Sequence, residues 1–243
     1  MLITLSIMKD RRTKSPPGSP IASFALPGED RPLSKAVSTV IAAMEADIIA
    51  GRILPGNRLI EDHLMADYAA KRHVVRAALE ELERLGVVQK RRHVGAELKR
   101  YEHDEIVNLY GMREILHRAA IRGIKARSAE DIAGVERWLR IHAEAAASGD
   151  LVEVHRTNMM FHNALFELCR NPFLTFAIRH HDWLSFPIRA YGVSDVAALQ
   201  RACREHRKML DCLRKGDLET LEELAVAHMT PARQIYERKF VRH

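Results

Sequence analysis

Apolar residues recur every three or four positions along most of this 243-residue sequence. This spacing is typical of amphipathic helices. Aromatic residues make up only 6% of the chain, and Ala, Leu, Arg and Glu are abundant, which also favours helix over strand. We therefore predict a mainly α fold. The C-terminal part is predicted to be an all-α bundle, with helices over about 103–126, 130–147, 151–170, 172–190, 195–215 and 217–239.

The segment 34–100 combines shorter helices with a small hairpin. Apolar spacing and turn residues predict helices over about 35–50, 61–68 and 71–85, and strands over 87–92 and 96–99. A helix, a helix-turn-helix and a β-hairpin wing in this order predict a winged helix-turn-helix domain. Such a domain places its recognition helix in the major groove of double-stranded DNA.

Composition and charge divide the chain into three parts. Residues 1–33 are rich in proline, glycine and serine, so we expect a flexible arm there. We assign 34–100 to the DNA-binding domain and 101–243 to the helical domain. Lysine and arginine outnumber aspartate and glutamate by 17 to 12 in residues 1–100, but only by 21 to 20 in the remainder. The basic excess therefore belongs to the part that is predicted to bind DNA.

Basic residues are concentrated on the predicted recognition helix and in the wing. Arg72 and Arg76 are four residues apart, so they share one helix face, where a guanidinium group can contact guanine or phosphate. Lys71 and His73 lie near the helix N-terminus, which favours phosphate binding. Solvated surface residues are the alternative interpretation, but the position in a helix-turn-helix favours DNA contact. The candidates in the wing are Arg91, Arg92, His93 and Gly95.

Several stretches resemble a known family of transcription regulators. The segments Gly51 to Leu59, Arg72 to Leu79 and Leu85 to Val88 resemble the winged helix of the GntR family. The second half resembles the FCD effector domain of the FadR subfamily, and the resemblance rests on Asn158-Met159-Met160-Phe161-His162, Glu205-His206, Gly216-Asp217 and His228. Lys71 departs from the pattern, because the family usually has a helix-capping hydroxyl there. The resemblance therefore implies DNA binding but no particular operator sequence.

The resemblance implies a ligand-responsive regulator, most often a repressor, that binds a pseudo-palindromic DNA operator as a homodimer. Residues 101–243 would then form the domain for effector binding and dimerisation. Effectors of such domains are commonly small carboxylates. Arg113 matches an arginine of the family and is our candidate for a cation that faces the ligand. An ion pair within its own helix is the alternative role.

The resemblance also implies a metal site formed by Asn158, His162, His206 and His228. Asn158 and His162 are four residues apart, so they project from one face of a predicted helix. Imidazole ligands suit a divalent transition metal such as Zn or Ni. Spacing alone does not select these residues among the 13 histidines of the chain. The family more commonly has aspartate where Asn158 stands, and a neutral amide binds a cation less strongly than a carboxylate.

Other functional classes find less support in the sequence. It contains no GxSxG, HExxH, paired CxxC or glycine-rich phosphate loop, so we expect no enzymatic activity. Two alternatives stay open, a metalloenzyme with an accessory DNA-binding domain and a DNA-binding scaffold that needs no ligand. Three cysteines are too few for a disulfide framework, and no apolar run is long enough to span a bilayer. We therefore expect a cytoplasmic protein without a membrane partner.

Overall fold

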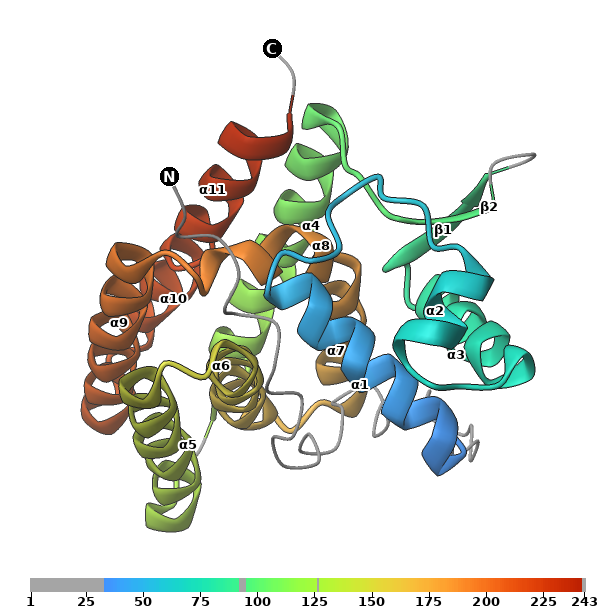
Figure 1. Cartoon of the computed structure of the whole chain (residues 1–243). Helices are drawn as coiled ribbons and strands as arrows, with labels where there is room; N and C mark the ends of the chain where they lie inside the picture. The colour runs from blue at the N-terminus through green and yellow to red at the C-terminus, as the bar shows by residue number, and fades with distance from the viewer. Residues whose placement is uncertain (1–32, 92–94, 126, 242–243) are drawn as a thin grey trace, which may run out of the picture.

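A computed structural model describes residues 33–91, 95–125 and 127–241. The described chain is mainly α-helical, with one two-stranded hairpin, as the sequence predicts. Figure 1 shows the winged domain and the helical domain side by side, with the first helix crossing between them. The flexible arm expected over 1–33 lies outside the described residues, apart from Leu33.

The N-terminal domain has the predicted order of helices and strands. Ser34 caps its first helix, because the side-chain oxygen accepts a hydrogen bond from the backbone N–H of Val37. The wing is an antiparallel pair in which Val88 lies opposite Leu98. The elements are α1 (Lys35–Ile49), α2 (Glu61–Asp67), α3 (Arg72–Arg84), β1 (Val88–Arg91) and β2 (Gly95–Leu98).

The C-terminal domain consists of helices only, but two of the predicted helices are broken. The segment 172–190 divides before Pro187, and the segment 217–239 divides before Pro231. Proline has no backbone N–H to donate to the carbonyl four residues earlier, so neither helix can continue through its proline. The elements are α4 (His103–Arg122), α5 (Ala129–Ser148), α6 (Leu151–Glu167), α7 (Pro172–Leu184), α8 (Phe186–Arg189), the 3-10 helix η2 (Ala190–Gly192), α9 (Val196–Lys215), α10 (Leu218–Ala227) and α11 (Thr230–Phe240).

The two domains share a hydrophobic core. Trp183, Phe186 and Tyr191 of the helical domain pack in the same buried cluster as the apolar faces of α1 and α3. The Tyr191 hydroxyl donates a hydrogen bond to the carbonyl of Ile53, at 2.9 Å. A second cluster lies within the helical domain alone, between α4, α5, α6, α7, α9 and α10. The segment from α7 to η2 therefore belongs to the helical domain and also supports the winged domain.

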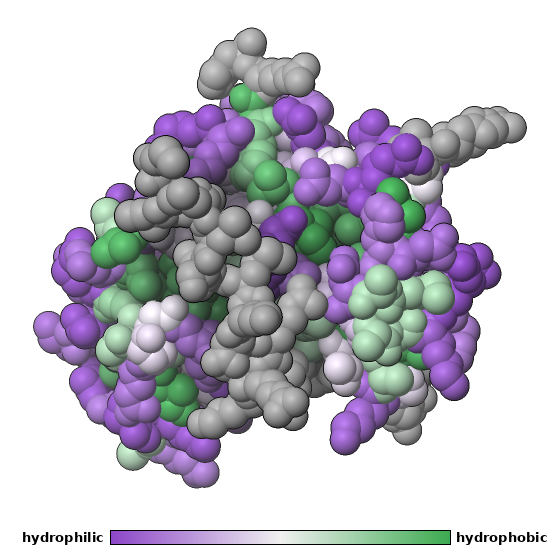
Figure 2. Space-filling view, viewed as in Figure 1, coloured by the Kyte–Doolittle hydropathy of each residue, from purple (hydrophilic) through white to green (hydrophobic). Residues whose placement is uncertain are grey.

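In the view of Figure 2, hydrophilic residues dominate the outer edges of both domains, and apolar residues show on the faces inside those edges. Within the described ranges, no helix is long and apolar enough to cross a membrane.

Candidate functional site

Three histidines from separate parts of the helical domain meet at one point. His162 lies on α6, His206 lies on α9, and His228 directly follows α10. The Nε2 atom of His206 is 3.2 Å from Nε2 of His162 and 3.1 Å from Nε2 of His228. All three residues offer a ligand atom within 4.8 Å of the others. The fold thus assembles the three histidines that the resemblance implies as metal ligands.

The donor set and its spacing fit a transition metal. Two nitrogen atoms bound to one tetrahedral zinc ion at about 2.0–2.1 Å lie roughly 3.3 Å apart. The observed separations of 3.2 and 3.1 Å are close to that value. Burial lowers the pKa of His162 and of His206 well below the ordinary value, so both imidazoles are neutral and keep a lone pair for a cation.

Glu205 contacts the ring nitrogen of His228 that does not face the other two histidines. Its Oε2 atom lies 2.7 Å from Nδ1 of His228. A carboxylate at this position holds the proton on Nδ1 and leaves Nε2 of His228 free to face the other two histidines. Arg201 pairs with the other side of the same carboxylate, at 2.6 Å from Oε1. Glu205 is part of the family resemblance, but no role was predicted for it from the sequence.

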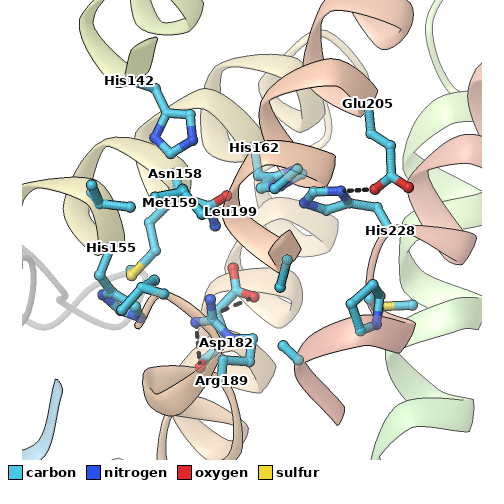
Figure 3. Close-up of a pocket in the computed structure, with 18 of the residues that line it drawn as sticks. His142, His155, Asn158, Met159, His162, Asp182, Arg189, Leu199, Glu205 and His228 are labelled. Atoms are coloured by element: carbon cyan, nitrogen blue, oxygen red, sulfur yellow. Dashed lines mark hydrogen bonds and ion pairs between the residues drawn. The ribbon is translucent and has the colours of Figure 1, made fainter. Parts of the chain in front are cut away.

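Two further polar side chains line the cavity next to the histidine cluster. Asn158 lies on α6 one turn before His162, as the sequence predicts, and both face the cavity (Figure 3). His142, on α5, was not predicted. Its Nδ1 atom lies 3.0 Å from the hydroxyl of Thr157, and its ring centre lies 5.0 Å from that of His206. Its Nε2 atom is buried and has no hydrogen-bond partner among the described residues.

Arg113 lies in the wall of the same cavity, but its ion pair is not within its own helix. The side chain is buried, and Nη1 donates to the Oδ1 atom of Asp182 on α7, at 2.7 Å. The same nitrogen contacts the hydroxyl of Ser185 and the carbonyl of His181. Burial alone would raise the pKa of Asp182, but the charges of Arg113 and Arg189 outweigh burial and lower it.

Arg189 is a second arginine at this end of the cavity and was also not predicted. It lies at the end of α8, and its Nη2 atom donates to the backbone carbonyl of Asp182 at 3.0 Å. Figure 3 shows Arg189 and Asp182 across the cavity from His162 and His228. The cavity has a volume of about 100 Å³, which is enough for several water molecules or a small organic molecule.

The arginines of the predicted recognition helix α3 are held by acidic residues of α2. Arg72 contacts Glu61 at 3.2 Å and Asp62 at 2.6 Å. The Nε atom of Arg76 donates to both carboxylate oxygens of Glu61, at 2.9 Å each. Both arginine side chains are about half exposed, at 49% and 57%. They share one exposed face, as their spacing predicts.

The remaining DNA candidates lie around this face. Lys71 is the N-cap residue of α3 without a side-chain cap, and His73 is exposed in its first turn. Arg91 ends β1 and pairs with Glu97, at 2.7 Å. Gly95 begins β2 with a φ of +91°, a conformation that favours glycine. The wing candidates Arg92 and His93 lie outside the described residues.

Two family models cover most of the described chain. The model of bacterial regulatory proteins of the gntR family matches residues 36–98. The FCD domain model matches residues 108–231, which contain the histidine cluster and both cavity arginines. The chain belongs to the GntR family and carries an FCD domain. The FCD domain fits the FadR subfamily, as the resemblance implies, and DNA-binding transcriptional regulation is the activity of the family.

Relatives and solved structures of the GntR family agree with this assignment. A probable D-xylose utilization operon transcriptional repressor of Paenarthrobacter nicotinovorans is 26% identical over 79% of this chain and 86% of its own length. The HTH-type transcriptional regulator LutR of Bacillus subtilis strain 168 is 23% identical over 74% and 91%.

Among solved structures, McbR/YncC of E. coli has a TM-score of 0.69 at 18% identity and covers 86% of this chain and 100% of its own. A GntR regulator from Rhodococcus sp. RHA1 has a TM-score of 0.68 at 20% identity, over 85% and 100%. These structures share the fold of this GntR protein. The family and its relatives are transcriptional regulators and not enzymes, as expected from the missing catalytic motifs.

The cavity of this GntR protein also contains histidines that burial keeps neutral. His155, on α6, is 5% exposed, and burial lowers its pKa to about 3. Its ring packs edge-on against Phe186. His117, on α4, is buried against Phe166, and its pKa is also lowered to about 3. These two residues remain uncharged at neutral pH, so they add no charge to the cavity.

We predict that His155→Gln makes the stability of the protein less dependent on pH. The pKa of His155 is near 3 in the folded state and ordinary, near 6.5, in the unfolded state, so protonation favours unfolding below about pH 6.5. Its contribution is complete above that pH and is lost as the pH falls toward 3. Between these two pKa values, each such group lowers the free energy of unfolding by about 1.4 kcal/mol for every unit that the pH falls.

Urea unfolding of metal-free protein between pH 7 and pH 4 measures this slope. In the variant, the free energy of unfolding should change with pH less steeply than in wild type, by about 1.4 kcal/mol per pH unit. This difference is expected whatever the stability of the variant at pH 7. His103→Gln is the matched control, because His103 is exposed. A slope that is the same in all three proteins contradicts the prediction.

Proposed function

We propose that this protein is a ligand-responsive transcriptional repressor whose FCD domain binds a divalent transition metal and a small carboxylate effector. The observation that carries the metal site is the convergence of three imidazole Nε2 atoms, with Glu205 behind one of them. Operator DNA, effector and a second copy of the chain are the proposed partners. The proposed location is the cytoplasm, where operator DNA lies.

The residues present favour a nitrogen-rich site for zinc, nickel or a similar ion. His162, His206 and His228 would be the nitrogen ligands, and the amide oxygen of Asn158 would be the weaker fourth one. All four ligands are neutral, so a bound ion keeps its double positive charge. When bound, an ion that accepts more than these four ligands would supply an open coordination position that attracts an anion. A carboxylate effector suits this charge better than a neutral molecule.

We predict that the purified protein holds about one transition-metal ion per chain, and that His162→Ala and His206→Ala lose it. Glu205→Gln should keep the three ligands but weaken metal affinity by about 10–100-fold, because the supporting carboxylate is lost. Elemental analysis of untagged protein gives the metal content per chain, and competition with a chelator gives the metal affinity. His103→Ala should retain the metal, since His103 is exposed. A protein that stays metal-free after reconstitution contradicts the metal site.

The shared core offers a route from the effector to DNA. Arg189 lines the cavity, and Tyr191 two residues later hydrogen-bonds to Ile53 of the winged domain. An effector that alters the position of α8 would therefore alter the support of the winged domain. It regulates only if its affinity differs between two arrangements of the domains.

The DNA contacts that we propose are made by α3 and the wing. Arg72 and Arg76 would be the principal contacts, and Lys71, His73, Arg91, Arg92, His93 and Gly95 would be secondary ones. In the free protein Glu61 neutralises part of the charge of both arginines. The negative charge of Glu61 beside both arginines opposes the approach of DNA phosphates, so it reduces nonspecific binding along with specific binding.

We predict opposite effects for two substitutions in this pair. Arg76→Ala should weaken binding to a selected operator by about 1–3 kcal/mol if Arg76 contacts a base, and should weaken all sequences alike if it contacts phosphate. Glu61→Gln should strengthen binding to unrelated DNA, because it releases Arg76. Fluorescence anisotropy at fixed salt, with an operator selected from random duplexes and a scrambled duplex, measures both effects.

Arg140→Ala is the matched control, because Arg140 is an exposed helical arginine of the other domain, with its own acidic partner Glu144. Unchanged DNA affinity in the Arg76 variant would remove that residue from the proposed interface.

An exposed apolar face on α4 supports the proposed homodimer. Val107, Met112 and Ile115 are 43%, 42% and 62% exposed and lie on one side of the helix. Gly111 lies beside them, and a Cβ atom there would have no neighbour within 4 Å. A small residue within an apolar face lets another helix approach closely. A two-fold dimer through this face would pair α4 with its own copy and present two recognition helices to two half-sites.

We predict that Ile115→Asp yields a folded monomer, because a two-fold interface would place two buried carboxylates close together. Sedimentation velocity gives the oligomeric state, and circular dichroism checks the fold. Phe173→Asp is the control, because Phe173 is 77% exposed on a different helix, α7, and the substitution should leave the dimer intact. A wild-type protein that sediments as a monomer would contradict the proposed dimer.

A further inference from the structure

The end of the cavity opposite the histidines carries an excess of positive charge. Arg113 and Arg189 face a single carboxylate there, that of Asp182. Glu205, the other acidic residue in the cavity wall, lies at the histidine end and is already paired with Arg201. His155 stays neutral beside the arginines. The arginine end therefore has one positive charge that no residue in the cavity wall balances.

The hydrogen bonds show which of the two arginines has N–H donors available for a ligand. The Oδ1 atom of Asp182 lies 2.7 Å from Nη1 of Arg113 but 3.9 Å from Nη2 of Arg189. Arg189 donates only to a hydroxyl and a backbone carbonyl, through Nε and Nη2. Its Nη1 makes no hydrogen bond within the described part of the chain. A guanidinium group has five N–H donors, so Arg189 retains donors for a ligand.

Two buried polar atoms at this end also lack partners. The Nε atom of Arg113 and the Nε2 atom of His155 have no hydrogen bond among the described residues, although both residues are about 95% buried. Unpaired polar atoms at such depth are costly, and a bound ligand or water commonly satisfies them. Both residues line the cavity. These atoms point to a polar group that the protein itself does not supply.

The wall between the two ends of the cavity is largely apolar. Val154, Met159, Leu199 and Ala202 line it, and they suit a short hydrocarbon chain better than a polar one. The cavity thus has a cation-binding end, an apolar middle and an arginine end. A molecule complementary to all three has an oxygen anion at each end and methylene groups between.

We propose that Arg189, with Arg113 and His155 beside it, forms an anion subsite, and that the effector is a short-chain dicarboxylate. One carboxylate binds Arg189 and the other lies at the histidine end. The second contact rests on the metal-dependent effector binding proposed above, whereas the first rests on the arginines alone. Arg189 is then the residue that distinguishes dicarboxylates from monocarboxylates.

Calorimetric titration of the full-length protein tests this assignment with acids of matched chain length. The pairs are malonate with propionate, succinate with butyrate, and glutarate with valerate. In metal-loaded wild type, the best dicarboxylate should bind at least about 10-fold more tightly than its partner, because a buried charge-assisted pair is gained. Arg189→Gln should weaken dicarboxylate binding by about 10–100-fold and monocarboxylate binding by less than about 3-fold.

Two further variants separate loss of the subsite from loss of the fold. Arg189→Lys keeps the charge without the planar fork and should fall between wild type and Arg189→Gln. Arg179→Gln removes an exposed arginine of α7 and should change nothing. Circular dichroism and metal content should match wild type in all three variants.

The outcomes distinguish this inference from the proposed function. If each pair of acids binds alike, or Arg189→Gln weakens both members equally, the arginine subsite is wrong while metal-dependent carboxylate binding stands. If dicarboxylates bind equally well without metal and still need Arg189, the subsite stands and the metal-dependent effector site is wrong. If no acid binds metal-loaded or metal-free protein, both are wrong.

Discussion

The buried ion pair between Arg113 and Asp182 fixes the part of the molecule where its two domains meet. It joins α4 to the end of α7, and Ser185 in the following turn contacts the same guanidinium group. Buried ion pairs add little net stability. Removing one partner, however, leaves the other charge buried and unpaired, which lowers the free energy of unfolding by about 3–5 kcal/mol. The pair therefore specifies the position of α7 more than it stabilises the fold. Phe186 and Tyr191 follow this point in the chain and contact the winged domain, so the position of α7 also determines how that domain is supported.

Asp182 also determines the charge of the effector cavity. Its lowered pKa keeps the carboxylate ionised at neutral pH, so it balances one of the two buried arginines. With two carboxylates the arginine end would be neutral, and with none the two guanidinium groups would repel each other at close range. A single carboxylate shared by Arg113 and Arg189 leaves one cation for a ligand. The same side chain thus maintains the domain junction and an unbalanced charge.

The sequence predicted the elements better than the contacts between them. Helical spacing identified α1 and α9 almost to the residue, because amphipathic periodicity is local. Pro187 and Pro231 were visible signals for the two missed breaks. The pairing of Arg113 with Asp182, 69 residues later, has no local signal, because it depends on how α7 packs on α4. The three histidines were found through the resemblance, whereas His142 was missed because α5 reaches the cluster only through packing.

The two ends of the cavity are built on different helices. The histidine end is built on α6, α9 and the end of α10, which contribute to the core of the helical domain, and Met159 of α6 also packs in the core shared with α1. Arg189 belongs to α8, in the segment that shares a core with the winged domain. A ligand that binds one end only gains nothing from a change in their separation. A ligand that binds both ends favours the separation that matches its own length, and this differential affinity is what regulation of the winged domain requires.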